Sequence, residues 1–527
     1  MTRAVVVGGG IAGLATAALL ARDGYDTTLV EARDALGGRA GSWECDGFRF
    51  DTGPSWYLMP DAFDHFFRLM GTTAAEQLDL VDLDPGYRIY SEGIPEPIEL
   101  RKSRADNVAL FESIEPGAGA ALERYLDSAK SVYALADQKF LHTTFAKFGP
   151  IFTADVLRRG AEFARLLLQP LDRFVAKRFT NPRLRQILGY PAVFLGSSPY
   201  ATPSMYHLMS HLDLDDAVRY PMGGFTQIID RIASLAVDAG VDVHTSTRAV
   251  SIRVDDGRAT GVTVVGRDGA QATLDADVIV TAGDLFRTET ELLPEAQQTY
   301  GADWWAKRTP GPSALLIFLG GRGELPQLEH HTLFFTEDWR QGFDAIFGDD
   351  PRIPNPASLY VCKPSQTDPS VAPAGHENVF VLVPIPADPS LGRGDVDGDG
   401  DPMIEAAADR AIAQIAEWAG IPDLADRIVV RRTMGPRDFE ADLGTWLGNA
   451  LGPAHTLRQS AFFRAGNVSK KVDGLLYAGA STIPGIGLPM CLISAELVIK
   501  RLRGDVSAGP MPAPLVPSVS PSAEVAE

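Results

Sequence analysis

The sequence predicts an α/β fold with a Rossmann-like parallel sheet, and two observations near its N-terminus support this. A β-branched run from Ala4 leads into the glycine turn Gly8-Gly9-Gly10, and an alanine-rich stretch follows the turn. A second apolar run ends at Glu31, 18 residues beyond Gly13. A strand, a glycine turn, a helix and a distant carboxylate in this order are the fingerprint of a dinucleotide-binding site.

Each residue of this fingerprint has a physical role. Gly8 permits a tight turn, Gly10 lets the backbone approach a pyrophosphate, and Gly13 lets the helix pack closely on the strand. The helix N-terminus directs unpaired N–H groups toward the phosphates. Glu31 is placed to bind both ribose hydroxyls, and its charge would repel a 2′-phosphate.

The uncharged run from Ala4 to Leu20 has an alternative interpretation. It follows Arg3, so it resembles a signal peptide or a membrane span. The three consecutive glycines, the pair Arg22-Asp23 and the carboxylate at Glu31 favour the nucleotide site instead.

Length and composition limit the class of protein. A chain of 527 residues is too long for one simple core, which favours two intertwined domains. A net charge of −20 argues against nucleic acid as a partner. Cys45, Cys362 and Cys491 lie far apart, so we expect neither a metal site nor disulfides, and a reducing cytoplasm fits. Beyond Leu20 no uncharged run reaches the ~18–20 residues of a spanning helix, so we expect a cytoplasmic, soluble or peripheral protein.

The predicted elements divide the chain into two interleaved domains. The nucleotide-binding domain is expected to combine residues 1–74, 215–290 and 430–504. An α+β substrate domain is expected to combine residues 75–214 and 291–429. Residues 505–527 hold five prolines among small residues, which predicts a disordered tail.

Residues 139–185 differ from the rest of the chain in charge. They hold ten basic and three acidic residues, a balance of +7. Apolar residues recur among them at helical spacing: Phe152, Val156, Phe163, Leu166, Leu167, Leu171 and Phe174. A basic amphipathic segment is typical of an element that docks on a membrane surface. The alternative is a solvated helix face that pairs with acidic loops.

A second strong signal lies near the C-terminus. A strand from Gly474 leads into the glycine–proline turn Gly479–Pro489, and a helix follows to about Arg501. Glycines let the backbone reach the edge of a flat ring, and the helix N-terminus would stabilise negative charge on a reduced flavin. The alternative is a plain strand–turn–helix that closes the sheet. With the N-terminal fingerprint, the turn favours FAD as the cofactor; no second fingerprint follows a strand, so we expect no nicotinamide.

In these motifs the sequence resembles the bacterial-type phytoene desaturases, which are carotenoid desaturases and isomerases among the FAD-dependent, amine-oxidase-like flavoproteins. The motifs span nearly the whole chain: Gly8–Gly13, Gly37–Arg39, Phe50–Pro54, Tyr220–Gly224, Gln459–Arg464 and Gly479–Pro489. The resemblance implies a domain of the two-dinucleotide-fold flavoprotein type with an intertwined α+β substrate domain. It also implies non-covalent FAD and a long apolar polyene taken up at a membrane.

The resemblance further implies cofactor contacts for named residues. The pyrophosphate would be lined by Gly8, Gly10, Ala12 and Gly13, the ribose would be bound by Glu31, and the phosphate or ribityl region would be held by Arg39. The adenine would meet the backbone of Val250, and the ribityl chain and ring would lie near Gly479, Ala480 and Leu488. The predicted set is completed by Gly38, Gly53, Pro54, Ser55 and Gly283.

The chain departs from the family at one turn. The family's usual turn reads Thr-His-Pro-Gly, whereas here Thr482 is followed by Ile483. A mechanism that needs a histidine at that position is therefore not expected in this chain.

The activity implied by the resemblance is desaturation of phytoene toward lycopene. Hydride passes from the polyene to flavin N5, a proton is lost, and a quinone or oxygen receives the electrons; no catalytic base can be assigned. Candidates to line a substrate tunnel, each of which could equally be core, are Trp56, Tyr57, Phe194, Tyr200, Tyr206, Phe462 and Phe463.

Alternative activities remain open. A diapophytoene or hydroxyneurosporene desaturase, or a carotenoid terminal oxidase, would share all these motifs. A flavin amine or porphyrinogen oxidase is a more distant alternative. A carotenoid-binding or membrane-scaffold protein that keeps FAD only for structure is the alternative outside catalysis.

Overall fold

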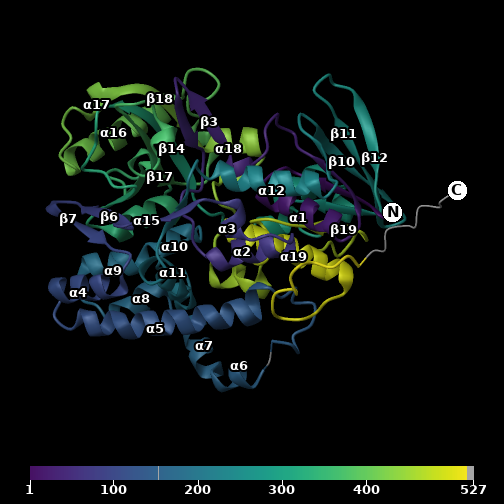
Figure 1. Ribbon diagram of the computed structural model, residues 1–527, viewed down its shortest axis with the longest axis horizontal. Helices are drawn as coiled ribbons and strands as arrows, with labels where there is room; N and C mark the ends of the chain where they lie inside the picture. The colour runs from purple at the N-terminus through teal and green to yellow at the C-terminus, as the bar shows by residue number, and fades with distance from the viewer. Residues whose placement is uncertain (152, 519–527) are drawn as a thin grey trace.

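Two sheets organise the computed structural model, which describes residues 1–151 and 153–518 (Figure 1). The first is a parallel sheet of five strands in the order β19-β13-β1-β2-β9. Its strands are β1 (Arg3–Val7), β2 (Asp26–Val30), β9 (Asp242–His244), β13 (Val278–Thr281) and β19 (Leu475–Tyr477). A parallel sheet assembled from distant parts of the chain confirms the predicted Rossmann-like α/β fold.

The parallel sheet is covered on both faces. Ala4 and Val6 belong to the core shared with the helices, whereas Val5 contacts the core shared with an antiparallel sheet. The helices are α1 (Ile11–Arg22), α12 (Thr226–Asp238) and α19 (Leu488–Arg503). The antiparallel sheet contains β10 (Arg248–Asp255), β11 (Arg258–Val265) and β12 (Gln271–Asp275). Because both faces are buried at its centre, the central strands β1 and β13 are apolar along most of their length, whereas the edge strand β9 is not.

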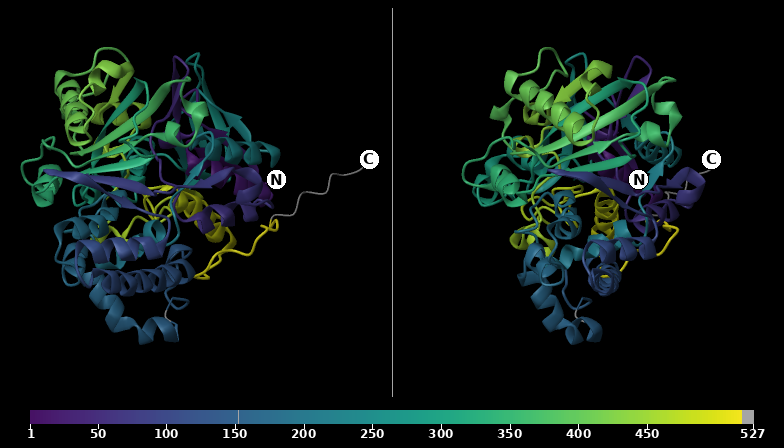
Figure 2. Two further views of the ribbon diagram at one scale, coloured as in Figure 1. Left: turned by 60° about the vertical axis from the view of Figure 1, so that its left-hand side comes forward. Right: turned by 90° about the vertical axis from the view of Figure 1, so that its left-hand side faces the viewer.

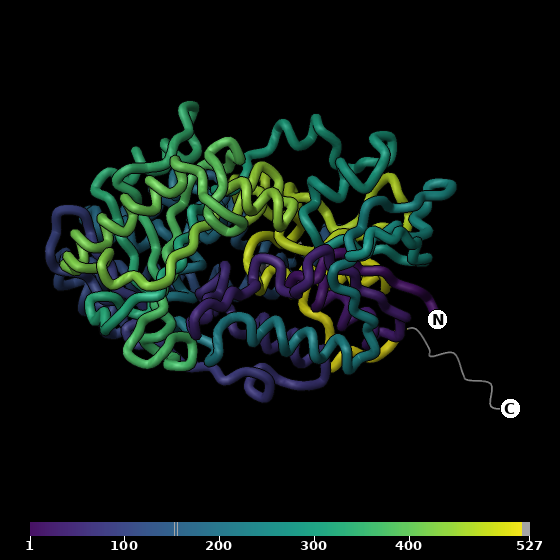
Figure 3. The backbone as a smooth tube through the Cα atoms, turned by 90° about the horizontal axis from the view of Figure 1, so that it is seen from above, coloured from purple at the N-terminus to yellow at the C-terminus, as the bar shows by residue number. Residues whose placement is uncertain are grey.

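The uncharged N-terminal run is a buried helix. Every residue from Ile11 to Leu20 is buried, because α1 lies against the sheet and packs on both α12 and α19. Figure 3 shows the N-terminal chain, in purple, beside the C-terminal chain, in yellow. Burial on all sides explains why this helix has no polar face.

The second sheet has seven strands in the order β18-β14-β17-β16-β15-β6-β7. They are β6 (Tyr87–Ser91), β7 (Ile94–Leu100), β14 (Ser313–Arg322), β15 (His331–Phe335), β16 (Leu359–Cys362), β17 (His376–Ile385) and β18 (Ile428–Met434). Leu315 and Ile317 pack on α16 (Pro402–Trp418), whereas Leu316 and Phe318 face the opposite side. Strand β18 crosses the domain boundary expected at residue 430.

A layer of helices lies on the other side of this sheet from α16 (Figure 2). The layer contains α4 (Arg104–Ile114), α5 (Ala118–Ala136), α6 (Ala154–Arg158), α7 (Gly160–Leu168), α8 (Leu171–Ala176), α9 (Pro182–Gly189), α10 (Pro191–Phe194) and α11 (Met209–Leu214).

The other helices are α2 (Pro60–Leu69), α3 (Ala74–Gln77), α13 (Leu285–Glu291), α14 (Ala302–Trp305), α15 (Trp339–Phe347), α17 (Leu424–Arg427) and α18 (Pro436–Leu443). Short strands β3 (Ser42–Cys45) and β4 (Phe48–Asp51) pair, as do β5 (Leu80–Asp82) and β8 (Arg219–Pro221).

The basic segment 139–185 is a series of short helices. Phe163, Leu166 and Phe174 are buried in the protein core, so most of the predicted apolar face packs inward. Leu157 and Leu168 remain 65% and 73% exposed. Phe152 lies outside the described residues. Among the described helices, none has both the length and the apolar character needed to cross a bilayer.

Residues 505–518 pack on the protein, which corrects the prediction of a tail starting at 505; residues 519–527 lie outside the described part. Leu515 is buried, and its N–H donates to Leu69 O at 3.0 Å. The buried Lys500 ammonium donates to the carbonyls of Ser507 and Gly509. Composition predicted disorder because prolines prevent regular structure, but it could not reveal buried partners for these backbone groups.

A buried ion-pair network anchors the same region. His142 Nδ1 lies 2.8 Å from Glu496 Oε2, and His65 Nε2 lies 3.1 Å from the same oxygen. Burial alone would raise the pKa of Glu496, but the charge and hydrogen bond of His142 lower it to about 2. Burial opposes protonation of His142, yet Glu496 and Asp137 raise the pKa of His142 to about 9. At neutral pH the pair is therefore charged and joins α19 to the chain after α5.

We expect the free energy of unfolding to fall in alkaline solution, because deprotonation of His142 removes this ion pair. Folding raises the pKa of His142, so protonated His142 stabilises the folded protein. This contribution to the free energy of unfolding is complete below about pH 6.5 and is lost as the pH rises through about 9. The loss is on the order of 3 kcal/mol. Melting temperatures measured from pH 6.5 to 9.5 should fall in the wild type and fall less in His142→Gln. The exposed His244→Gln is the control; equal pH slopes in wild type and His142→Gln would contradict the assignment.

Candidate cofactor and substrate site

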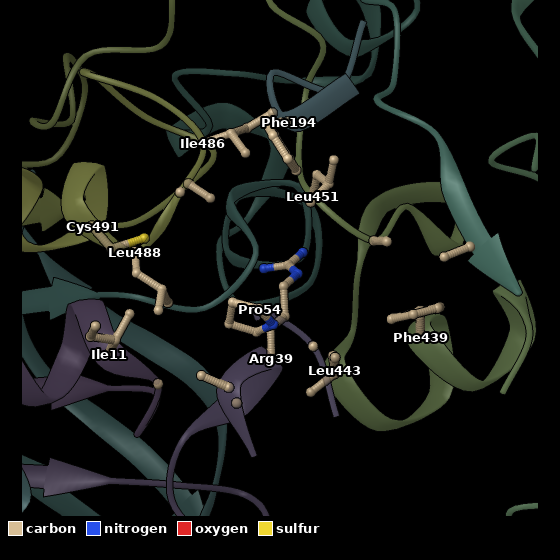
Figure 4. Close-up of a pocket in the computed structure, with 18 of the residues that line it drawn as sticks. Ile11, Arg39, Pro54, Phe194, Phe439, Leu443, Leu451, Ile486, Leu488 and Cys491 are labelled. Atoms are coloured by element: carbon tan, nitrogen blue, oxygen red, sulfur yellow. The ribbon is translucent and has the colours of Figure 1, made fainter. Parts of the chain in front are cut away.

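A cavity of about 630 Å³ extends from the carboxyl ends of the parallel strands to the space beneath the seven-stranded sheet. Its walls come from the glycine turn after β1, from one face of the second sheet and from the helical layer. In Figure 4 the Arg39 side chain extends into this space, with Ile11 and Leu488 on one side and Phe439 and Leu443 on the other. Polar and strongly apolar walls therefore belong to one continuous site.

The turn after β1 forms the polar end. A Cβ on Gly13 would lie 1.8 Å from Gly8 O, so only glycine allows α1 to approach the turn this closely. A Cβ on Gly10 would come no nearer than 3.8 Å to another residue and would instead occupy the cavity. The first N–H groups of α1 have no partners within the helix and face this space. This is a cradle for a pyrophosphate.

Glu31 lies in the same wall at the end of β2. Its carboxylate accepts the N–H of Gly9 at 2.6 Å and of Arg33 at 2.8 Å. These bonds fix the carboxylate while leaving oxygen lone pairs toward the cavity, where ribose hydroxyls would donate.

Arg39 and Asp284 face each other across the cavity. Arg39 Nη2 lies 3.8 Å from Asp284 Oδ2, beyond hydrogen-bond distance, and both atoms are buried without a hydrogen-bond partner. Burial raises the pKa of Asp284, although Arg39 opposes this. Unpaired buried polar atoms are costly, so these two groups fit a ligand that carries phosphate or hydroxyl groups.

Arg464 fixes the glycine–proline turn at the opposite end. Its buried guanidinium donates to Thr482 O at 3.0 Å, Ala480 O at 2.5 Å and Pro453 O at 3.0 Å. Burial lowers the pKa of Arg464 to about 10, which leaves it charged at neutral pH. One side chain thus joins the turn to the segment that begins near Pro453, and the N-terminus of α19 faces the cavity at Leu488.

The structure brings all but two of the predicted cofactor residues to the cavity. Those that line it are Gly8, Gly10, Ala12, Glu31, Gly38, Arg39, Gly53, Pro54, Ser55, Gly283, Gly479, Ala480 and Leu488. Gly13 lies behind the turn, where it permits close packing. Val250 is exposed at an irregularity in the β10–β11 pairing, and Ala249 lines the cavity instead.

Some of the aromatic residues proposed to line a substrate tunnel lie in the wall of the apolar end, and others do not. Trp56, Phe194 and Tyr206 line the cavity. Tyr57 is core and stacks on Phe63. Tyr200 is not in the lining but contacts Phe343, which is. Phe462 and Phe463 lie on the surface. Much of the remaining wall is sheet: Leu316, Phe318, Leu333 and Phe335.

Neither Asp284 nor this sheet wall was predicted from the sequence. A charged residue three positions after the end of the buried strand β13 was a usable signal for Asp284. The wall had no such signal, because β14 is apolar on both faces and no alternation marks the side that faces the cavity.

Comparisons with known proteins agree with this geometry. Residues 11–498 match the family model "Flavin containing amine oxidoreductase". A carotenoid 3,4-desaturase from Haloarcula japonica is 41% identical, covering 95% of this chain and 98% of the relative. A zeta-carotene-forming phytoene desaturase from Myxococcus xanthus is 33% identical, covering 95% and 93%. An oxidoreductase structure from Methanosarcina mazei has the same fold, with a TM-score of 0.58 at 15% identity over 94% of this chain and 100% of that one.

The fold and the cradle define an FAD-dependent oxidoreductase. The chain belongs to the flavin-containing amine oxidoreductase family and, within it, to the carotenoid desaturases. FAD fits the residues present: the glycine turn and α1 would hold the pyrophosphate, Glu31 the ribose, and Arg39 with Asp284 the polar linker. When bound, FAD supplies a two-electron acceptor at the boundary between the polar and apolar walls.

We expect Gly13→Ala to abolish cofactor retention. The added Cβ would force α1 away from Gly8 O, costing about 1–3 kcal/mol or more and displacing the phosphate cradle. The flavin absorbance of purified protein and its melting temperature measure both effects. Gly160→Ala is the matched control, because a Cβ there meets nothing within 4 Å. Equal flavin content in the two variants would contradict this account.

Proposed function

We propose that the protein desaturates a long acyclic carotenoid, with phytoene oxidised toward lycopene as the reaction. The observation that carries the proposal is the continuity of the apolar cavity with the FAD cradle. Desaturation removes a hydride and a proton from a saturated bond beside double bonds. The apolar walls would hold the polyene against the cofactor and exclude water, so that positioning supplies most of the catalysis. A quinone or oxygen would receive the electrons.

A second candidate is desaturation at the 3,4 position of a carotenoid that is already more conjugated. The 41% identity to a carotenoid 3,4-desaturase, against 33% to a phytoene desaturase, favours it. Both reactions use the same cofactor and the same kind of cavity.

Pigment analysis in two hosts would separate these reactions. Expressed in a phytoene-accumulating host, the protein should yield coloured products with longer conjugation, identified by chromatography and absorption spectra. Colour formed only in a host that accumulates lycopene-type carotenoids would assign the 3,4 position instead. Gly13→Ala is the inactive control. Purified protein without flavin, or no new pigment in either host, would contradict carotenoid desaturation.

We further propose that the protein docks on a membrane surface through an exposed aromatic cluster, which consists of Phe145, Phe148, Phe462 and Phe463. Phe148 and Phe462 have ring centroids 5.8 Å apart, and Phe462 and Phe463 are each 50% exposed. The cluster combines the basic segment with the loop that carries Phe462 and Phe463. Leu141 of the basic segment lines the cavity, as does His455, seven residues before Phe462. Exposed phenylalanines among basic residues favour an anionic lipid surface, from which an apolar substrate would enter.

Replacing two phenylalanines tests this surface. The double change Phe462→Ser and Phe463→Ser should reduce binding to vesicles containing phosphatidylglycerol at least about tenfold, because it removes two side chains that would insert into lipid. Co-sedimentation measures binding, and flavin absorbance verifies folding. Val237→Ser with Met403→Ser is the control, since both residues are exposed on helices outside the cluster. Unchanged vesicle binding would refute this role.

A further inference from the structure

A histidine outside the predicted motifs lies against the glycine–proline turn. Ile483 stands where the resemblance to the phytoene desaturases implies a histidine. Its side chain is buried in the core and does not line the cavity. The imidazole that does line the cavity belongs to His455, 28 residues earlier. The turn therefore has a histidine beside it that comes from another segment.

The imidazole of His455 is held in a fixed position. Its Nε2 accepts the N–H of Ile486 at 3.3 Å. A Cβ on Gly485 would lie 2.3 Å from this Nε2, so the ring packs directly on the glycine. The His455 N–H donates to Leu195 O at 3.1 Å. Arg464 joins Pro453 O to Thr482 O and so ties the segment of His455 to the turn.

The hydrogen bond from Ile486 determines the tautomer. Because Nε2 accepts, a neutral ring carries its proton on Nδ1. Burial, reinforced by the charge of Arg464, lowers the pKa of His455 well below its ordinary value, so the ring is neutral at pH 7. Nδ1 is buried and has no hydrogen-bond partner in the protein. The structure thus holds an unpaired, buried N–H donor on a residue that is only 3% exposed and that lines the cavity.

An unpaired buried donor costs about 1–3 kcal/mol, unless a ligand satisfies it. A hydrocarbon polyene, the substrate proposed above, offers no acceptor. The flavin ring offers two carbonyl oxygens and ring nitrogens. His455 lies on the residues that lead into the N-terminus of α19, where the chain is open to the cavity at Gly487 and Leu488.

We propose that His455 Nδ1–H donates a hydrogen bond to the flavin ring of bound FAD and thereby favours its reduced state. A neutral donor beside the N-terminus of α19 adds to the helix dipole, and both stabilise the electron-rich ring. His455 thus supplies, from the segment at 453–459, an imidazole that the turn itself lacks.

Two amide substitutions separate this role from a structural one. His455→Asn keeps a donor near the position of Nδ1 but loses the acceptor for Ile486 N–H. His455→Gln keeps an acceptor near Nε2 but loses the donor. His455→Phe removes both. The midpoint potential of the bound flavin and the melting temperature are measured for each holoprotein, without any carotenoid.

We expect His455→Gln and His455→Phe to weaken the preference of the protein for reduced over oxidised FAD about tenfold, which lowers the two-electron midpoint potential by about 30 mV. His455→Asn should keep a potential close to wild type while its melting temperature falls. If a variant retains too little flavin, the FAD dissociation constants of the Asn and Gln variants are compared; the Gln variant should bind more weakly.

Equal potentials in wild type and the Gln and Phe variants would overturn the proposal. Unchanged potentials with activity lost only on oxygenated carotenoids would also overturn it, since the donor would then serve the substrate. Because the potential is measured without carotenoid, its outcome is independent of the proposed reaction.

Discussion

The close approach of α1 to the turn at Gly8 sets the position of much of the nucleotide-binding domain. With no Cβ at Gly13, the first turn of the helix lies directly on the strand end, and its N–H groups open into the cavity. Both α12 and α19 then pack on α1, so α19 is placed with its own N-terminus at the other end of the same cavity. One glycine contact therefore aligns two helix N-termini on a single ligand space.

The cofactor motifs could be predicted from the sequence because the residues that form each of them lie close together in the chain. The turn at Gly8, the carboxylate Glu31 and the turn around Gly479 each combine special backbone geometry with a short, recognisable spacing. Their assembly into a parallel sheet followed from the same patterns. The adenine contact expected at the backbone of Val250 stays a prediction, because the irregularity in β10 decides only that its side chain is exposed while Ala249 lines the cavity.

The remaining features depend on contacts between distant segments. His455 has no neighbouring motif, and its importance arises only because Arg464 brings its segment against the turn. The apolar residues of the basic segment have helical spacing, yet Phe163 and Leu166 meet the core while Leu168 does not. Spacing identifies a face, but only the tertiary structure shows what covers it.

The strand order of the parallel sheet has a consequence for synthesis of the chain. Strand β1 is made first, but its neighbour β13 begins at residue 278, and the next strand, β19, begins at residue 475. The parallel sheet that supports the glycine cradle is therefore complete only after residue 477 has left the ribosome. Until then the apolar α1 lacks its partner α19 and exposes a surface that binds other apolar chains. Closure of the parallel sheet is thus tied to synthesis of residues 475–503, and FAD can add its full binding energy only after that segment has packed.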